Sequence, residues 1–539
     1  MPRVLVSDKL PAAGLDLLKQ AGIELDDRQK LKGAELQEAL RAADGVIVRS
    51  DTRITADELE NPGRLRVIVR AGVGVDTIDV AAATRKGIVV MNTPGGNTVS
   101  TAEQTITLLM SLARHTPAAD ASMHQGKWEK SKFVGTQLAG RTLGVVGLGR
   151  IGREVARRAA GLDMKIIGFD PFLAAAGAAQ MGIETVAAVD ELLPRVDFLT
   201  VHTPLTDETR DLIDARRLAL LPKGARVINC ARGGIINEEA LAEALRSGHL
   251  AGAALDVFVQ EPPPADHPLL HLPNVVVTPH LGASTVEAQL SVATEAAQLL
   301  IDYLVKGVIG FAVNMAAVDK TELAELRLYV DMARRLGLIH AQMSQGAIQK
   351  AVLHYRGDVA RRPTRLITAA FAAGLLETRL DQHVNIVNAP LLAAERGIEI
   401  VEQTSSQQGD FSTLLRIELS TDKKTYTAAG TLFGNQFLRL VQLGPHHLEA
   451  FMDGVMLLFT HRDVPGLIGF IGNIFGKHQV NIAQMTVGRQ QPGGEAIAVL
   501  NLDSLPPEEA LKEVRVHPQI SSVSVVKLPP AGQLPPWFG

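Results

Sequence analysis

Residues 143–152 read LGVVGLGRIG and carry the spacing G-x-G-x-x-G at Gly147, Gly149 and Gly152. An apolar run precedes the glycines, and a helical pattern follows them over residues 153–160. In that context the first glycine allows a tight turn, the second admits a pyrophosphate, and the third lets the helix pack on the strand. The positive end of the helix then faces the pyrophosphate. The motif predicts a dinucleotide site in a parallel α/β sheet.

Asp170 follows the next apolar run, 18 residues after Gly152. A carboxylate at that point of such a fold accepts hydrogen bonds from the ribose hydroxyls and repels a 2′-phosphate. The alternative is a glycine turn without a ligand and a surface aspartate, but strand, helix and acid occur together here. We therefore expect the cofactor to be NAD rather than NADP.

Short apolar runs alternate with helical patterns throughout residues 1–310. This alternation is typical of βαβ units around a parallel sheet, and unbroken Val and Ile runs suit strands buried on both faces. We expect an α/β fold with a doubly wound, Rossmann-type sheet around the glycine motif. Strands are predicted at 67–69, 88–91, 145–146, 165–167, 198–201, 226–229 and 275–277.

Two sequences of the form S-T-x-E, at 100–103 and 284–287, match the capping box that begins helices. The pattern after the second sequence continues to Lys306 and stops at Gly307. Roughly twenty residues of helix span ~30 Å, which is enough to carry the chain from one domain back to another.

The C-terminal half contains no further nucleotide motif. Residues 311–450 mix strand and helix patterns, including a strand end followed by a turn at 354–358 and a helix at 364–376, which indicates a separate α+β domain. From residue 454 the predicted order is βαββαβ, a ferredoxin-like arrangement. Its elements are predicted at 455–460, 465–477, 480–487, 496–502, 507–514 and 521–527.

The 539 residues carry 54 Lys and Arg against 58 Asp and Glu, a net charge of −4. This balance argues against nucleic-acid binding, and the 4% aromatic content argues against stacking on single strands. The single cysteine, Cys230, excludes a disulfide framework and a Cys-rich metal site, and it fits a reducing cytosol. No apolar run reaches the ~18 residues of a membrane helix. We expect a cytoplasmic protein with no nucleic-acid, membrane or metal partner.

Arg232, Glu261 and His280 lie after three later predicted strands. Because ligands of open α/β sheets bind at the carboxyl ends of strands, these side chains can converge near the nicotinamide. The set suits alcohol oxidation: His280 takes the hydroxyl proton, Glu261 orients the imidazole, and Arg232 binds a substrate carboxylate. Singly, each has an ordinary alternative as a loop histidine, a turn residue or a helix cap. Cys230 is interpreted as a small core residue rather than a nucleophile.

Several further segments match motifs of one enzyme family. They are 48–50 (VRS), 70–76 (RAGVGVD), 91–94 (MNTP), 126–129 (GKWE), 229–234 (NCARGG), 256–262 (DVFVQEP) and 279–283 (PHLGA). Together with the glycine motif they make residues 1–310 resemble the D-2-hydroxyacid dehydrogenase family. The C-terminal half is similar to the intervening domain and the ACT domain of that family's long form, so the resemblance covers nearly the whole chain.

The resemblance implies NAD-dependent oxidation of 3-phospho-D-glycerate to 3-phosphohydroxypyruvate, the first step towards L-serine, by a homotetramer. It makes Arg232, Glu261 and His280 the catalytic residues. It places substrate at Arg49, Ser50, Gly72, Val73, Gly74 and Asn97. It places the cofactor at Gly147, Gly149, Arg150, Ile151, Gly152, Asp170, Thr203, Cys230, Ala231, Arg232, Asp256, His280, Gly282 and Ala283.

Two positions depart from the family or stay open. Val73 replaces a threonine that contacts the cofactor in some relatives, so that side-chain hydrogen bond is lost. The basic residue that helps to hold phosphate is either Lys130 or Lys132.

The resemblance also implies a discontinuous chain path. A flavodoxin-like substrate domain would comprise 1–97 and 286–310, and the NAD-binding domain 98–285. The intervening domain, with an allosteric or oligomerisation role, would comprise 311–452, and the ACT domain 453–528. The cleft between the first two would close on substrate and exclude water.

The ACT resemblance implies an amino-acid effector, for which L-serine as pathway end product is the expected feedback inhibitor. Asp463 would take its ammonium group and Asn481 its polar groups, while His461 stands where some relatives have tyrosine. The alternative is an ACT domain that binds no ligand and only supports association.

Two other functions remain open at this stage. A glyoxylate or hydroxypyruvate reductase would share the three catalytic residues but usually lacks the C-terminal half. An NAD-sensing corepressor would share the fold without turnover, but an ACT domain does not belong to that class. Formate dehydrogenases carry Gln where Glu261 stands, which disfavours that activity.

Overall fold

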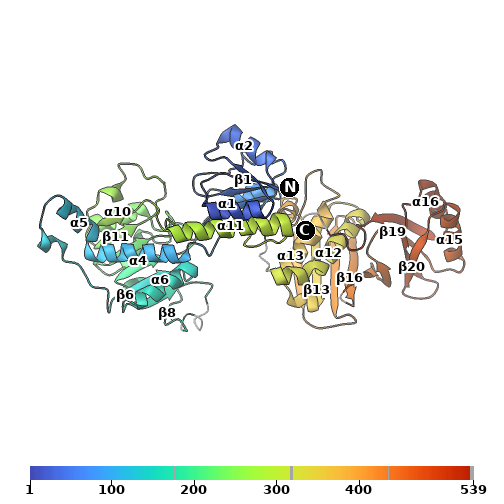
Figure 1. The fold of residues 1–539 in the computed structure, drawn as a ribbon. Coiled ribbons are helices and arrows are strands. Elements are labelled where there is room, and N and C mark those ends of the chain that lie inside the picture. The colour runs from blue at the N-terminus through green and yellow to red at the C-terminus, as the bar shows by residue number, and fades with distance from the viewer. Residues whose placement is uncertain (174–177, 179, 316–319, 435, 535–539) are drawn as a thin grey trace.

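The computed structural model describes residues 1–539 except 174–177, 179, 316–319, 435 and 535–539. Four β-sheets follow one another along an elongated molecule, with the N-terminal sheet near its middle and the C-terminal sheet at one end (Figure 1). Within the described residues, no helix combines the length and the apolar character that crossing a membrane requires.

The first sheet has five parallel strands in the order β2-β1-β3-β4-β5, which is the flavodoxin-like order. Helices α1 and α11 pack on one face, where apolar residues of α11 such as Val292 and Leu300 join the core of β1 and β4. The strands are β1 (Arg3–Val6), β2 (Glu24–Asp27), β3 (Gly45–Val48), β4 (Val67–Arg70) and β5 (Val89–Asn92). The helices are α1 (Ala12–Gln20), α2 (Gly33–Ala42), α3 (Val80–Arg85) and α11 (Val286–Lys306).

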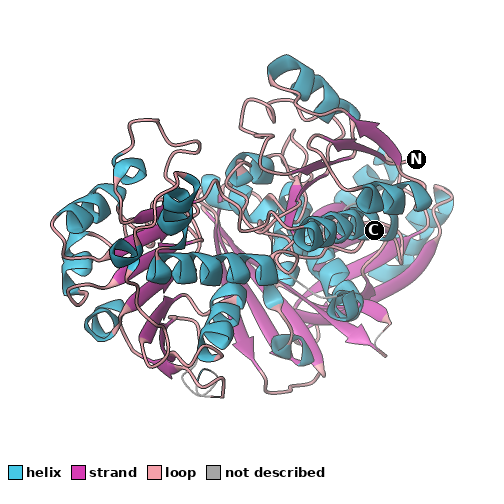
Figure 2. Ribbon diagram, turned by 60° about the vertical axis from the view of Figure 1, so that its left-hand side comes forward, coloured by secondary structure: helices cyan, strands magenta, loops and turns pink. Residues whose placement is uncertain are grey.

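The second sheet has seven parallel strands in the order β12-β11-β10-β9-β6-β7-β8, with helices on both faces (Figure 2). The strand order reverses between β6 and β9, as in a Rossmann-type sheet, so the predicted doubly wound fold is confirmed. The strands are β6 (Thr142–Val146), β7 (Lys165–Phe169), β8 (Glu184–Thr185), β9 (Phe198–Val201), β10 (Arg226–Asn229), β11 (Gly252–Leu255) and β12 (Val275–Val277). The helices are α4 (Thr98–Arg114), α5 (Thr116–His124), η1 (Lys130–Phe133), α6 (Arg150–Ala160), α8 (Val189–Leu192), η2 (Leu193–Arg195), α9 (Ala215–Leu220), α10 (Glu238–Arg246) and η3 (Pro268–His271).

Neither of the two helices begins at the residue that its predicted capping box indicates. Helix α4 begins at Thr98 after Asn97, so Ser100 lies inside the helix, where its hydroxyl donates to the Gly282 carbonyl at 2.7 Å. Helix α11 is capped by Thr285, whose hydroxyl accepts from the Ala288 N–H at 3.1 Å, one residue later than predicted. The prediction of a long helix ending before Gly307 is confirmed.

The third sheet is mixed, with the order β14-β13-β15-β16-β17-β18, and the fourth is antiparallel, with the order β20-β21-β19-β22. The fourth sheet confirms the predicted βαββαβ order, and α13 confirms the predicted helix at 364–376. The third sheet comprises β13 (Ile348–Gly357), β14 (Glu399–Ser405), β15 (Thr413–Thr421), β16 (Thr425–Phe433), β17 (Phe437–Leu443) and β18 (His446–Phe451), with α12 (Lys320–Met343), η4 (Asp358–Arg361), α13 (Thr364–Leu376) and α14 (Ala389–Glu395). The fourth comprises β19 (Val455–Arg462), α15 (Leu467–Lys477), β20 (Ile482–Arg489), β21 (Glu495–Leu502), α16 (Glu508–Arg515) and β22 (Ile520–Lys527).

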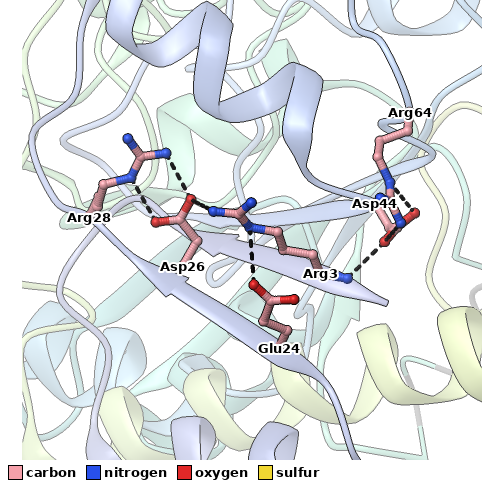
Figure 3. Close-up of polar contacts among 6 residues, drawn as sticks. All are labelled: Arg3, Glu24, Asp26, Arg28, Asp44 and Arg64. Carbon is pink, nitrogen blue, oxygen red and sulfur yellow. Dashed lines mark hydrogen bonds and ion pairs between the residues drawn. The ribbon is translucent and has the colours of Figure 1, made fainter. Parts of the chain in front are cut away.

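A polar network joins the edge strand β2, the neighbouring β1 and the turn before β3 in the first sheet (Figure 3). Asp26 accepts from Arg28 at 2.7 and 2.8 Å and from Arg3 at 2.9 Å, and Asp44 accepts from Arg64 at 2.9 and 2.7 Å. The hydrogen bonds from Arg28 and the nearby positive charges outweigh burial and lower the pKa of Asp26. The ionised carboxylate is therefore the form that the fold stabilises.

We expect Asp26→Asn to lower the first thermal unfolding midpoint at pH 7 by roughly 2–8 °C. The lost bonds are worth about 1–2 kcal/mol, because both arginines are partly exposed. Since the folded-state pKa lies below the ordinary value of 3.8, this stability is present above that pH and is lost as pH falls through the folded value. Calorimetric scans from pH 7 to 3 should therefore show the two proteins converging. A difference that stays constant down to pH 3, or that also appears with the exposed control Asp27→Asn, would contradict this assignment.

Candidate active site

The site residues predicted from the second sheet all follow the carboxyl ends of its strands. Gly147 follows β6, Asp170 follows β7, Arg232 follows β10 and His280 follows β12. Because these strands are parallel, their carboxyl ends lie at one edge of the sheet, where ligands of such folds bind.

The glycine turn leaves no space for side chains at two of its three motif positions. Gly147 has φ +94°, and a Cβ there would lie 2.6 Å from the His202 carbonyl oxygen. A Cβ at Gly152 would overlap the Gly147 carbonyl oxygen, whereas one at Gly149 would meet nothing within 4 Å. Helix α6 begins directly after Gly149, so its N-terminal N–H groups face the open side of the turn. This is an arrangement that fits a pyrophosphate.

Asp170 and Thr203 lie beside this turn. Asp170 accepts from the Leu148 N–H at 2.8 Å and from the Phe172 N–H at 2.8 Å. The buried Thr203 hydroxyl has no hydrogen-bond partner among the described residues, which leaves a polar group for a ligand. Together with the glycine cradle, these groups fit a bound dinucleotide.

Cys230 is buried at the end of β10, and burial raises the pKa of its thiol to about 12. The thiol therefore stays protonated at neutral pH, which agrees with a core role rather than a nucleophilic one.

His280 and Glu261 form a pair, with Nδ1 of His280 2.7 Å from Oε2 of Glu261. Because a carboxylate only accepts, Nδ1 carries the proton, and Nε2 of the neutral ring is left to act as a base. Burial acts to raise the pKa of Glu261, but the hydrogen bond and charge of His280, the Phe258 N–H and the charge of Arg232 together lower it. A largely apolar pocket of about 370 Å³ borders the pair.

Asp256 fixes the segment that carries His280. Its carboxylate accepts from the N–H groups of Leu281 and Gly282, each at 2.8 Å, and from the Thr278 hydroxyl. His280 itself has a φ of +55°, a conformation that L residues adopt rarely. Asp256 thus holds an unusual backbone turn in place beside the cofactor edge.

Arg232 lies on a turn that Asn229 holds from both sides. The Asn229 amide accepts from the Ala231 N–H at 2.9 Å and donates to the Arg232 carbonyl at 2.8 Å. The guanidinium reaches towards the first sheet, where Nε donates to Oδ2 of Asp76 at 2.8 Å. Sequence reasoning did not single out Asp76, because it lies 156 residues away in the chain.

The predicted substrate residues lie on loops of the first sheet. The buried Asp8 accepts from the Arg49 N–H and from the Thr52 hydroxyl, the latter at 2.6 Å, and so holds the loop that carries Arg49 and Ser50. Asn97 is the residue before α4, and its buried Oδ1 has no partner among the described residues.

Arg70 is a further basic residue at this place, and sequence reasoning missed its role. It ends β4, and a Cβ at Gly72 would collide with its guanidinium. Burial and the positive charges of Arg232 and Arg49 lower its pKa to about 10. The guanidinium groups of Arg70 and Arg232 therefore lie at the glycine turn 72–74, with the charge of Arg49 near enough to act on Arg70, and an anionic ligand would relieve this repulsion.

Lys130 and Lys132 lie on η1, and Lys132 donates to Glu129 at 2.6 Å. Within the described parts of the chain, neither lysine side chain hydrogen-bonds to a predicted substrate residue, so the choice between them stays open.

The predicted effector residues of the fourth sheet each have a partner within the chain or lie buried. Asp463 accepts from Arg489 at 2.7 Å and from the Gly493 N–H at 3.2 Å, and the pKa of its carboxyl is lowered mainly by the Arg489 hydrogen bond. Asn481 donates to Asp503 at 2.7 Å. His461 is buried, with Nδ1 2.9 Å from the Arg462 carbonyl.

Three protein families match segments of the chain. Residues 106–282 match the NAD-binding domain of D-isomer specific 2-hydroxyacid dehydrogenases. Residues 325–444 match the D-3-phosphoglycerate dehydrogenase intervening domain, and residues 455–518 match the ACT domain.

Curated relatives match over nearly the full length. The D-3-phosphoglycerate dehydrogenase of Methanocaldococcus jannaschii is 41% identical over 98% of this chain and 100% of its own length. The enzyme of the same name from Bacillus subtilis gives the same figures.

Solved structures match about three-fifths of the chain. The NAD-dependent formate dehydrogenase of Staphylococcus aureus, in complex with NAD, is 30% identical with a TM-score of 0.52, over 59% of this chain and 100% of its own. The TT0316 protein of Thermus thermophilus is 38% identical with a TM-score of 0.53, over 58% of this chain and 99% of its own.

Proposed function

The chain belongs to the D-3-phosphoglycerate dehydrogenase family of serine biosynthesis, and from this we propose which of its residues carry the reaction. The reaction is NAD-dependent oxidation of 3-phospho-D-glycerate to 3-phosphohydroxypyruvate. The observation that carries the assignment is the His280–Glu261 pair at 2.7 Å, at the edge where the glycine turn and Arg232 also lie.

His280 is the base in this proposal. Its Nε2 takes the proton of the substrate hydroxyl as the carbonyl forms, and Glu261 stabilises the resulting imidazolium through Nδ1. Gly147, Gly149, Gly152 and Asp170 would hold NAD, which when bound would supply the acceptor for the hydride of the carbinol carbon. Asp256 keeps the His280 turn in position while the proton moves.

The arginine cluster and the glycine turn hold the substrate. Arg232 binds the carboxylate as a fork, and Arg49 and Arg70 supply positive charge for the phosphate, which carries close to two negative charges at pH 7. Backbone N–H groups of the turn 72–74 add donors for an anion, and Ser50 and Asn97 complete the contacts.

The chain path supports the domain division given above, in which 1–97 with 286–310 bind substrate and 98–285 bind NAD, except that residues 311–314 also pack on β5 of the first sheet, where Ala312 pairs with Met91 and Asn314 accepts from the Val90 N–H at 2.9 Å. We propose that these two parts close over the reactants and exclude water. We also propose that residues 311–452 and 453–528 are regulatory, and that the enzyme is a cytoplasmic homotetramer.

A turnover assay tests the proposed function. Purified protein should reduce NAD with 3-phospho-D-glycerate and should be far less active with D-glycerate, which lacks the phosphate. Preferential reduction of glyoxylate or hydroxypyruvate would favour the reductase alternative, and NAD binding without turnover would favour the corepressor alternative.

L-Serine should inhibit through Asp463, because an ammonium group needs a carboxylate. We expect Asp463→Ala to raise the serine concentration for half-inhibition by about 5-fold or more, within the ~5–150-fold range of typical allosteric coupling, and to leave uninhibited turnover within about twofold. The ligand must displace Arg489, and this exposed pair is weak enough to yield. Inhibition curves for the parent, Asp463→Ala and the exposed control Glu509→Gln measure this. A parent insensitive to millimolar serine would instead indicate an ACT domain without a ligand.

A further inference from the structure

The loop 71–79, between β4 and α3, is held firmly at the edge of the first sheet. The Asn92 amide donates to the Val73 carbonyl at 2.6 Å, and the Ile54 N–H donates to the Thr77 carbonyl at 2.8 Å. Side chains on this loop therefore have a defined position opposite the second sheet.

Asp76 is the residue of this loop that reaches the second sheet. Its Oδ2 accepts from Nε of Arg232 at 2.8 Å, and Nη1 of Arg232 donates to the Ala231 carbonyl at 2.6 Å. A guanidinium has five N–H donors in a fixed plane. With Nε and one N–H of Nη1 engaged, the second N–H of Nη1 and both N–H groups of Nη2 have no partner among the described residues and remain for a ligand.

Gly74 provides the space for this guanidinium. A Cβ at position 74 would overlap Nη2 of Arg232 and would lie 2.7 Å from both Cζ of Arg232 and Oδ2 of Asp76. The backbone of Gly74 has no positive φ, so the need for glycine here is a matter of space rather than of conformation.

We propose that Asp76 and Gly74 are positioning residues for Arg232. Asp76 fixes the plane of the guanidinium through Nε, and the bare Gly74 backbone lets Nη2 face the substrate carboxylate between the two sheets. The proposal rests on the proposed function, because it takes Arg232 as the carboxylate anchor. It predicts a defect in substrate binding rather than in folding, since the Asp76 side chain is 60% exposed.

Asp76→Ala should raise KM for 3-phospho-D-glycerate by about tenfold, since a misplaced anchor costs up to ~10²-fold. KM for NAD and the unfolding midpoint should match the parent. Asp76→Asn should recover part of the loss, because its amide oxygen still accepts from Nε. The matched control is Asp57→Asn, an exposed carboxylate of the same part of the chain.

Gly74→Ala gives an independent test. The three atoms nearest to the added methyl are the ends of two side chains and not backbone, so the protein should fold with an unchanged midpoint while the guanidinium is displaced. We expect a rise in KM at least as large as for Asp76→Ala. The Arg232→Lys variant has no Nε for Asp76 to hold. In that background, Asp76→Ala should raise KM for 3-phospho-D-glycerate further by less than about twofold.

The outcomes separate this inference from the proposed function. If Arg232→Ala is inactive but Asp76→Ala or Gly74→Ala has a KM at or below that of the parent, the positioning role is wrong and the anchor role stands. If Arg232→Ala keeps parental KM, the anchor role itself is wrong. A KM defect in Asp76→Ala that persists undiminished in the Arg232→Lys background would show that Asp76 acts elsewhere.

Discussion

His280→Ala should lower kcat by at least about 10²-fold, the low end of general acid–base contributions. Nδ1 of His280 is bound to Glu261 at 2.7 Å, so the ring presents Nε2 to the substrate hydroxyl, and alanine leaves no base at that point. The glycine turn and Asp170 are untouched, so the dissociation constant of NAD should stay within about twofold. Steady-state oxidation of 3-phospho-D-glycerate and titration of NAD by calorimetry measure the two quantities.

Glu261→Gln separates orientation of the imidazole from its charge. The amide oxygen still accepts from Nδ1, but the imidazolium loses the carboxylate that stabilises it. We expect a smaller loss of kcat and an acid limb of the pH–rate profile at lower pH. His271→Ala, which changes an exposed histidine on η3, should behave like the parent. Near-parental turnover of His280→Ala would remove the histidine from the mechanism.

The architecture of the first two sheets was predictable because its signals are local. Apolar runs of four or five residues mark strands buried on both faces, and the glycine spacing of Gly147, Gly149 and Gly152 marks one strand-to-helix turn. Once the strands are parallel, their carboxyl ends share an edge, and this is why Glu261 and His280 could be expected to meet.

Helix starts were harder to predict because several residues compete for the cap. Ser100 fits a capping box by sequence, yet its hydroxyl bonds the Gly282 carbonyl on the neighbouring loop. That tertiary contact is invisible in a four-residue window. Asn97, Thr98 and Ser100 are all acceptable near a helix start, so only packing against the second sheet decides where α4 begins.

Pairs that join distant parts of the chain could not be read from the sequence. Asp76 and Arg232 lie 156 residues apart on loops of different sheets, and neither loop has a periodic pattern that aims its side chains. Arg489 likewise reaches Asp463 from the end of the strand β20. The charges are visible in the sequence, but the partner of each charge is set by the fold.

Arg232→Ala is expected to lower kcat/KM by about 10²–10⁴-fold. Two hydrogen bonds from a guanidinium to a carboxylate are worth roughly 1.5–3 kcal/mol each, and alanine removes both together with the charge. Arg70 and Arg49 remain close by, which limits the loss by keeping the turn 72–74 positive. Because Arg232 is bound to loops rather than to the core, the unfolding midpoint should change little.

Arg232→Lys separates the contribution of the positive charge at position 232 from that of the paired guanidinium donors. Lysine keeps a positive charge but lacks Nε and the planar pair of donors, so it cannot hold Asp76 and at the same time meet both carboxylate oxygens with a fork. We expect the kcat/KM of Arg232→Lys to lie between those of Arg232→Ala and the parent. The fold-decrease in kcat/KM should be as large with D-glycerate as with 3-phospho-D-glycerate, because both substrates carry the same carboxylate. Arg246→Ala, on the exposed side of α10, is the matched control. If phosphate-bearing and phosphate-free substrates lost different factors, Arg232 would have to be placed at the phosphate end of the substrate instead.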